Sequence, residues 1–164
     1  YKSAIAIETL NELRENNYIE CSDTKIKKGI YNAVLKGRFE VVSKHPLVIV
    51  DGAHNEEGMR ALVDSCADYD NIRILFSALA DKPYNKMLKQ LYRLTDDITV
   101  CEFDFPRAAK AEVIAEGFDV NIIHDYKKAI DTLVNEDKTL LICGSLYFIS
   151  DVRDYFLKKG ESTL

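Results

Sequence analysis

The sequence predicts an α/β fold, a doubly wound and mostly parallel sheet of six strands flanked by helices. Short runs rich in Val, Ile and Leu recur along the chain, and helical periodicity follows most of them. Several runs are apolar at successive positions, which is typical of strands covered on both faces. The predicted strands are 39–43, 47–50, 72–76, 98–103, 120–123 and 139–143. We expect five of them to be parallel and 39–43 to be antiparallel, because residues 44–46 form a tight turn.

Helices are predicted between these strands and after the last one, because apolar residues recur there at three- and four-residue spacing. The predicted helices are 55–67, 84–91, 110–116, 126–133 and 148–156. Strand–helix units in this order are typical of a Rossmann-like fold.

Residues 1–36 lie outside this alternation and form a short helical segment ahead of the sheet. One helix is predicted over 1–17 and a second over 22–35. We expect residues 1–36 to be the helical end of a preceding domain and its hinge, and 37–164 to be the α/β domain. Because Tyr1 stands where a natural chain has Met, we expect the sequence to be a fragment.

The composition excludes several classes of function. Lys and Arg number 22 against 27 Asp and Glu, which gives a formal net charge of −5 without a basic cluster. This balance argues against nucleic acid or an anionic membrane as partner. Apolar runs stay well below the roughly 20 residues of a membrane-spanning helix.

The four cysteines are scattered singly, without a CxxC pair or zinc-finger spacing to a histidine. They are Cys21, Cys66, Cys101 and Cys143. We expect buried free thiols in a reducing compartment, and therefore a cytoplasmic protein.

Open parallel sheets bind ligands beyond the carboxyl ends of their strands. This rule selects the loops at 51–55, 77–82, 105–107, 124–125 and 144–145. The sequence contains neither a GxxxxGK[ST] phosphate loop nor a GxGxxG motif after the first strand, so these loops are not phosphate cradles of the usual kind.

The loop VIVDGAHNEEG is the most informative of these. Asp51 closes a buried strand, Gly52 permits a close backbone approach, and Asn55 can cap the following helix. Glu56 and Glu57 in the first helical turn would repel a phosphate. The loop therefore suits hydroxyl donors such as a ribose diol. In the alternative, Asp51 and Asn55 only cap and tie the loop, and the residues alone do not favour the ribose over this structural role.

Five further side chains are candidates, each with a structural alternative as a cap or a solvated charge. His54 can donate a hydrogen bond or act as a weak base. Arg38 offers a planar donor, while Lys82 and Arg107 can hold a carboxylate or a phosphate. Ser145 either caps the final helix or contacts a ligand. None of these residues is expected to bind a metal.

In this order, GRFEVV, DGAHN, ALADK, PRA and ICGSLYFISDVR closely resemble the C-terminal domain of the folylpolyglutamate synthase/dihydrofolate synthase family, within the Mur ligase superfamily. The resemblance implies an ATP-dependent ligase. In that family ATP converts a substrate carboxylate to an acyl phosphate, which the amino group of glutamate attacks. The resemblance places the phosphate loop and the Mg²⁺ ligands in a central ATPase domain that this chain lacks, so the chain alone should fold but be inactive.

The resemblance also implies roles for individual residues. Arg38 and Asp51 would contact ATP, with Asp51 on the ribose, and Asn55 would belong to the same nucleotide site. His54 would face the reaction centre as the catalytic residue. Ser145 would contact the incoming L-glutamate, whose carboxylate a helix N-terminus favours.

Lys82 and Arg107 match positions on the substrate side of the family's site. The sequence departs from the family pattern at Lys36 and Glu56, where proline is usual. Both lie beside the motifs rather than within them.

Folate and dihydropteroate both remain open as the acceptor of glutamate. Two alternatives also remain: another Mur-type ligase, acting on a peptidoglycan precursor, and a non-catalytic nucleotide-binding domain. Nucleic acid and membranes are not expected partners.

Overall fold

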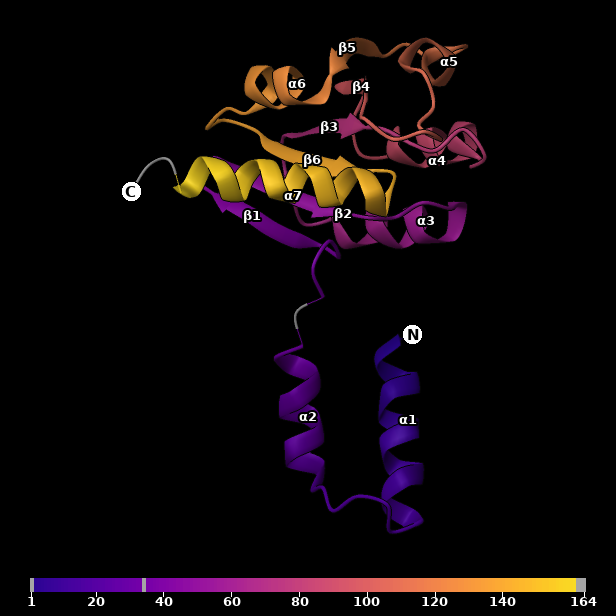
Figure 1. Cartoon of the computed structure of the whole chain (residues 1–164), viewed down its shortest axis with the longest axis vertical. Helices are drawn as coiled ribbons and strands as arrows, with labels where there is room; N and C mark the ends of the chain where they lie inside the picture. The colour runs from indigo at the N-terminus through magenta and orange to yellow at the C-terminus, as the bar shows by residue number, and fades with distance from the viewer. Residues whose placement is uncertain (1, 34, 162–164) are drawn as a thin grey trace. The chain divides into compact units, whose positions relative to one another are not determined.

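The computed structural model describes residues 2–33 and 35–161 of the chain, which divides into two compact units. The first unit is Tyr1–Leu35 and the second is Lys36–Leu164. Figure 1 shows a pair of helices in the first unit and a sheet with helices on both faces in the second. The division falls one residue before the predicted boundary. That residues 1–36 belong to a preceding domain stays a prediction.

The first unit consists of α1, Lys2–Glu15, and α2, Asp23–Tyr31. Ser22 caps α2, because its side-chain oxygen accepts a hydrogen bond from a backbone N–H of the first turn at 3.3 Å. An ion pair between Arg14 and Asp23 joins the two helices.

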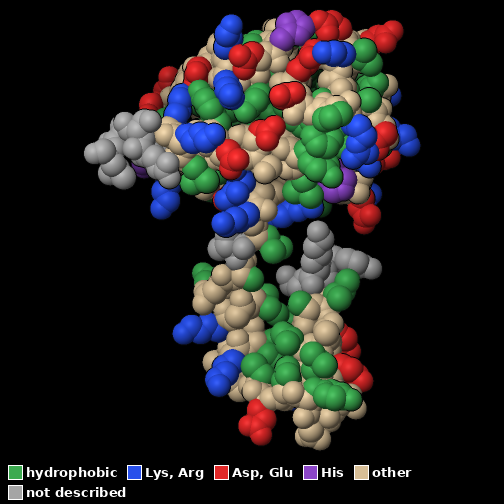
Figure 2. All heavy atoms as spheres, in the orientation of Figure 1, with side chains coloured by type: hydrophobic (Ala, Val, Ile, Leu, Met, Phe, Trp, Pro, Cys, Tyr) green, Lys and Arg blue, Asp and Glu red, His purple; other side chains and the backbone are tan. Residues whose placement is uncertain are grey.

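The second helix is shorter than the predicted range of 22–35, of which residue 34 lies outside the described residues. The helix ends at Tyr31, and Asn32, a residue of low helix propensity, forms its C-cap. Tyr31 is 91% exposed and Leu35 is 60% exposed, so neither apolar side chain is packed in this unit. Figure 2 shows further apolar side chains of α1 and α2 on the visible surface.

A six-stranded sheet in the order β1-β2-β6-β3-β4-β5 forms the centre of the second unit. The strands are β1 Glu40–Lys44, β2 Leu47–Asp51, β3 Ile72–Phe76, β4 Ile98–Glu102, β5 Asn121–Asp125 and β6 Thr139–Cys143. β1 is antiparallel to β2, and the remaining neighbours are parallel. The predicted fold class, with five parallel strands and one antiparallel strand, is confirmed.

Five helices cover the two faces of this sheet. They are α3 Glu56–Ser65, α4 Tyr84–Leu91, α5 Ala111–Ala115, α6 Tyr126–Leu133 and α7 Leu146–Glu161. Strand side chains alternate between two cores, as a period of two residues requires. Ile49, Ile74 and Leu141 pack with α3, α4 and α5. Val50 and Ile142 belong to the other core, with α6 and α7 (Figure 1).

Four predicted strands differ from the structure at their ends, and those predicted at 47–50 and 98–103 end at Asp51 and at Glu102. The first strand begins at Glu40 rather than at Phe39, because Phe39 has a left-handed φ of 44° that a strand does not accept. The strand predicted at 120–123 runs from Asn121 to Asp125 and is largely exposed, and β5 is an outermost strand of the sheet.

Three of the four cysteines, Cys66, Cys101 and Cys143, are buried free thiols as predicted, whereas Cys21 is only half-buried. Burial raises the pKa of the Cys66 thiol to about 11, which keeps it protonated and unreactive. Among the described helices, none has the length and apolar character to cross a membrane.

Candidate functional site

The carboxyl ends of three adjacent strands lie level at one edge of the sheet. Cys143, at the end of β6, is in register with Asp51 of β2 and with Phe76 of β3. The loops that follow these strands therefore start side by side, which is where an open parallel sheet binds its ligands.

Three segments distant in sequence converge at this edge: 37–39, 51–55 and 144–146. The Gly52 N–H donates a hydrogen bond to the Gly37 carbonyl at 2.8 Å. A Cβ atom at Gly52 would lie 2.2 Å from the Leu146 side chain, so only glycine permits this approach. The motifs GR, DGAHN and GSLY thus meet at one place.

Arg38 lies at the centre of a tightly held turn. Gly37 has a φ of 69° and Phe39 a φ of 44°, and a left-handed conformation at a non-glycine residue costs roughly 1–2 kcal/mol. Hydrogen bonds hold the turn: the Gly37 N–H donates to Glu40 at 2.5 Å, and the Phe39 N–H donates to Asp51 at 2.8 Å. The backbone that carries Arg38 is therefore fixed despite its strain.

The Arg38 side chain itself is half-buried and is left without a partner. Within the described part of its own unit, residues 36–161, its guanidinium makes no hydrogen bond or ion pair. An arginine held by its backbone, with its fork of donors unused, is available to a phosphate, a carboxylate or an aromatic ring of a ligand.

Asp51 ties the loop together, as its structural alternative predicts. One carboxylate oxygen accepts the Phe39 N–H, and the other accepts the Ala53 N–H at 2.7 Å. A carboxylate has about four acceptor positions, so two of them stay open. Asp51 is only half-buried and can accept a ligand hydroxyl while it keeps its structural bonds.

His54 has its two ring nitrogens in different states. Nδ1 lies 2.8 Å from the Gly52 carbonyl oxygen, which can only accept, so Nδ1 carries a proton. In the neutral ring Nε2 then keeps its lone pair. Nε2 has no hydrogen-bond partner in the part of the chain that the structure describes. It can accept a proton or a hydrogen bond from a ligand.

Asn55 is the N-cap of α3, because its side-chain oxygen accepts the Gly58 N–H at 2.7 Å. This is the hydrogen bond that the capping role of Asn55 predicts. The side-chain amide nitrogen remains as a donor at the surface.

Ser145 directly precedes α7 and is 1% exposed. The capping alternative requires its hydroxyl to accept an N–H of the first turn, and the described residues contain no such bond. The Ser145 hydroxyl therefore has no hydrogen-bond partner among the described residues, although the residue is almost completely buried. It is a free polar group at the site.

Lys82 and Arg107 lie together on the loops that follow β3 and β4. Both pair with Asp81, at 3.3 Å and 3.5 Å respectively. Burial acts to raise the pKa of Asp81, but the two cations outweigh it, and the pKa lies below its ordinary value. The two predicted cations thus share one carboxylate.

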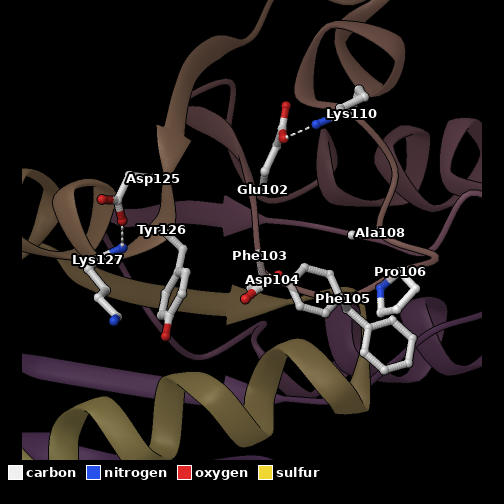
Figure 3. A pocket seen from close by; sticks show the side chains of 10 residues that line it. All are labelled: Glu102, Phe103, Asp104, Phe105, Pro106, Ala108, Lys110, Asp125, Tyr126 and Lys127. Carbon is white, nitrogen blue, oxygen red and sulfur yellow. Dashed lines mark hydrogen bonds and ion pairs between the residues drawn. The ribbon is translucent and has the colours of Figure 1, made fainter.

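A pocket of about 510 Å³ lies beyond the ends of β4 and β5 (Figure 3). Phe105 and Tyr126 contribute to its wall. Phe105 also stacks on Tyr147 at 4.3 Å and carries the Arg107 guanidinium at 5.8 Å from its ring. Phe105 directly precedes the PRA motif and Tyr147 is the last residue of GSLY, but no role was predicted for either aromatic ring.

Among the described residues, one group of side chains has the chemistry and spacing of metal ligands. It consists of Glu102, Glu112 and His124, whose ligand atoms lie within 4.8 Å of one another. Glu102 already binds the Lys110 ammonium at 2.8 Å, and His124 lies between the two glutamates. Because the Lys110 charge repels a cation, we interpret this group as an ion-pair network.

Comparison with known proteins identifies the class. The family model of the Mur ligase glutamate ligase domain matches residues 37–146, so the chain belongs to this family.

The individual relatives are more specific. The chain is 36% identical over 160 residues to the dihydrofolate synthase/folylpolyglutamate synthase of Bacillus subtilis, an alignment that covers 92% of this chain and 37% of that protein. The Yersinia pestis bifunctional folylpolyglutamate synthase/dihydrofolate synthase, solved with AMPPNP and Mn, superposes with a TM-score of 0.74 at 29% identity, over 84% of this chain and 35% of that one.

A cell-wall enzyme is also related to the chain. The UDP-N-acetylmuramoyl-L-alanyl-D-glutamate–2,6-diaminopimelate ligase of Wolinella succinogenes is 32% identical over 131 residues, which covers 67% of this chain and 28% of that protein. The chain spans roughly a third of the length of these relatives.

Proposed function

We propose that the chain is the C-terminal domain of an ATP-dependent folylpolyglutamate synthase/dihydrofolate synthase. The complete enzyme would join L-glutamate to the γ-carboxylate of folate, or to dihydropteroate, through an acyl phosphate. The observation that carries this proposal is the convergence of 37–39, 51–55 and 144–146 at one edge of the sheet, where Arg38, His54 and Ser145 keep polar atoms free.

Arg38, Asp51 and Asn55 would form the nucleotide side of the site. Arg38 contributes a charged donor in a fixed turn, and Asp51 has open acceptor positions for the ribose hydroxyls. The AMPPNP in the Yersinia pestis relative supports a nucleotide as ligand. We expect a divalent metal, Mg²⁺ in the cell, to bind to ligands outside this chain.

His54 and Ser145 would form the amino-acid side. The ammonium of glutamate must lose a proton before it can attack an acyl carbon, and the free Nε2 of His54 can accept one. The Ser145 hydroxyl and the N-terminus of the 16-residue helix α7 favour a carboxylate. The glutamate ligase name of the matching family supports glutamate as the substrate here.

Lys82 and Arg107 would hold a further carboxylate of the substrate. Their present partner, Asp81, lies at the surface, and exposed ion pairs contribute little, about 0–1 kcal/mol. A substrate carboxylate can therefore replace Asp81 at small cost.

Residues 1–36 would complete a preceding ATPase domain. Ile5 is 56% exposed, and Tyr18, Tyr31 and Leu35 are exposed as well. Exposed apolar residues at this density are typical of a surface that another part of a protein covers. Closure of the two domains would exclude water, which otherwise hydrolyses an acyl phosphate.

The test uses the full-length protein that contains this chain, with ATP, Mg²⁺ and both L-glutamate and 2,6-diaminopimelate as amino-acid substrates. Dihydropteroate, tetrahydrofolate and a UDP-N-acetylmuramoyl dipeptide are offered in parallel, and products are identified by mass. We expect glutamate to be added to at least one of the two pterin compounds, with ADP released. Ligation restricted to the muramoyl precursor would establish the cell-wall alternative that the Wolinella relative supports. Absence of ligation with all three would favour a non-catalytic nucleotide-binding domain.

A further inference from the structure

A half-buried ion pair links the beginning of the sheet to the last helix. Arg153 of α7 donates from Nε to a carboxylate oxygen of Glu40 at 2.8 Å. The side chains are 19% and 17% exposed. Both residues belong to motifs of the sequence, GRFEVV and ISDVR, whose role the proposed function leaves open.

The same oxygen of Glu40 also holds the turn that carries Arg38. It accepts the Gly37 N–H at 2.5 Å in addition to Arg153. Burial acts to raise the pKa of Glu40, but the bonds from Arg153 and Gly37 outweigh it and keep the pKa below its ordinary value. Glu40 is therefore an anion that two donors share.

Two backbone N–H groups and the packing of the Phe39 ring against Tyr69, with ring centroids 5.8 Å apart, also hold this turn. The Gly37 carbonyl is bound by Gly52, and the Phe39 N–H is bound by Asp51. Without the Glu40 anion, the strained N-terminal side of the turn loses its hydrogen bond. Arg38 would then lose the fixed backbone from which it extends, because its own guanidinium has no partner in the described residues.

We propose that Glu40 and Arg153 are positioning residues, which hold Arg38 in the conformation that contacts the nucleotide. This inference rests on the proposed function of Arg38. It makes α7 a structural support for both sides of the site, since Ser145 precedes the same helix. It also fixes Arg38 to the second unit, beyond the boundary at Lys36.

A second ion pair provides a matched control. Arg73 binds Asp97 at 3.1 Å, with side chains 18% and 24% exposed, close to the values for the Glu40 pair. These residues lie near the start of β3 and just before β4. This is the edge of the sheet where the parallel strands begin, opposite to the edge with the candidate site. Loss of this pair should destabilise the fold without any effect on nucleotide binding.

The experiment measures steady-state kinetics of the full-length protein, with ATP varied and the other substrates saturating. The variants are Arg38→Ala, Glu40→Gln, Arg153→Met, Arg153→Lys and, as control, Asp97→Asn. We expect Glu40→Gln and Arg153→Met each to raise the KM for ATP roughly tenfold, with kcat changed less than about twofold. A double variant that combines Glu40→Gln with Arg153→Met should have a KM for ATP no higher than that of either single variant, because the two residues act as a unit. Arg153→Lys, which keeps the charge, should recover part of the loss.

The outcomes separate this inference from the proposed function. If Arg38→Ala raises the KM for ATP but Glu40→Gln and Arg153→Met raise it no more than Asp97→Asn does, the positioning role is wrong and the nucleotide role of Arg38 stands. If Arg38→Ala leaves the KM for ATP unchanged, the nucleotide contact is wrong and the positioning role falls with it. Melting temperatures of all variants identify any that fail to fold. If Glu40→Gln or Arg153→Met fails to fold, the KM for ATP of Arg153→Lys, the mildest change, decides.

Discussion

The parallel strands begin at one edge of the sheet, the amino edge, and end at the other, the carboxyl edge. Among the described residues, a charged cluster at the first is paired, whereas polar groups of the candidate site at the second are left without partners. At the amino edge, Asp97 accepts hydrogen bonds from Arg73 and from Lys138, at 2.7 Å for the latter, so these three charges are paired. At the carboxyl edge, Arg38 stands in a strained turn without a partner, and His54 leaves Nε2 free. Paired charges stabilise the fold, whereas a free group held in place at an energetic cost indicates a ligand site.

The largest expected effect is on catalysis and distinguishes two histidines. His54→Ala in the full-length protein should lower kcat about 100-fold or more, because positioned acid–base groups contribute roughly 10²–10⁴-fold. His124 is the matched control. It lies on β5, and its ring nitrogens face Glu102 and Glu112. His124→Ala should leave kcat within about twofold. Equal losses in both variants would remove the functional distinction between the two histidines.

The next effect concerns stability at the amino edge. Asp97→Asn should lower the free energy of unfolding by about 1–3 kcal/mol, because hydrogen bonds from charged groups to a half-buried carboxylate are lost. Urea denaturation measures this change. The KM for ATP should stay at the wild-type value, and an increase comparable to that of Arg38→Ala would show that the two edges are not independent.

A pH dependence of stability follows from the same carboxylates. Burial acts to raise the pKa values of Asp97 and Glu40, but their cationic partners lower them below the ordinary values. The unfolded chain therefore binds protons at higher pH than the folded one. The stabilisation is present above the unfolded pKa, near 4, and is lost as the pH falls through the folded values.

Thermal melts should therefore show a plateau near neutrality and a decline below about pH 4.5. Asp97→Asn should make this decline shallower, since one of the groups that titrate is removed. Asp151 acts in the opposite direction, because burial and two nearby aspartates raise its pKa. A decline as steep in the variant as in the wild type would show that Asp97 does not contribute.

The smallest effect distinguishes the cysteines of the two units. Under native conditions a thiol reagent should modify the half-buried Cys21 first. Cys66, Cys101 and Cys143 should react only on unfolding, because burial raises the pKa values of all three thiols. Mass spectrometry of the labelled peptides gives the order. Early modification of Cys143 would show that the sheet opens near the proposed site.

Much of the fold was predictable because its signals are local. Apolar runs such as 139–143 and 72–76 mark buried strands, and a turn at 44–46 predicts the antiparallel pair. The edge position of β5 was not predictable, since exposure depends on strand order rather than on the strand's own residues.

The site was only partly accessible from sequence, for physical reasons. The motifs selected Arg38 and Ser145, but their lack of partners is a property of the folded surroundings. Glu40 and Arg153 are 113 residues apart, so no sequence spacing connects them. The left-handed conformation of Phe39 is equally hidden, because it is imposed by the bond to Asp51 and not by residue type.

The most direct test is a crystal structure of the full-length protein with AMPPNP, Mg²⁺ and L-glutamate. We expect the Arg38 guanidinium and the Asp51 carboxylate within hydrogen-bonding distance of the nucleotide, and the Ser145 hydroxyl within hydrogen-bonding distance of glutamate. Nucleotide bound instead in the pocket beside Phe105 and Tyr126, with the Arg38 guanidinium still without a partner, would contradict the account.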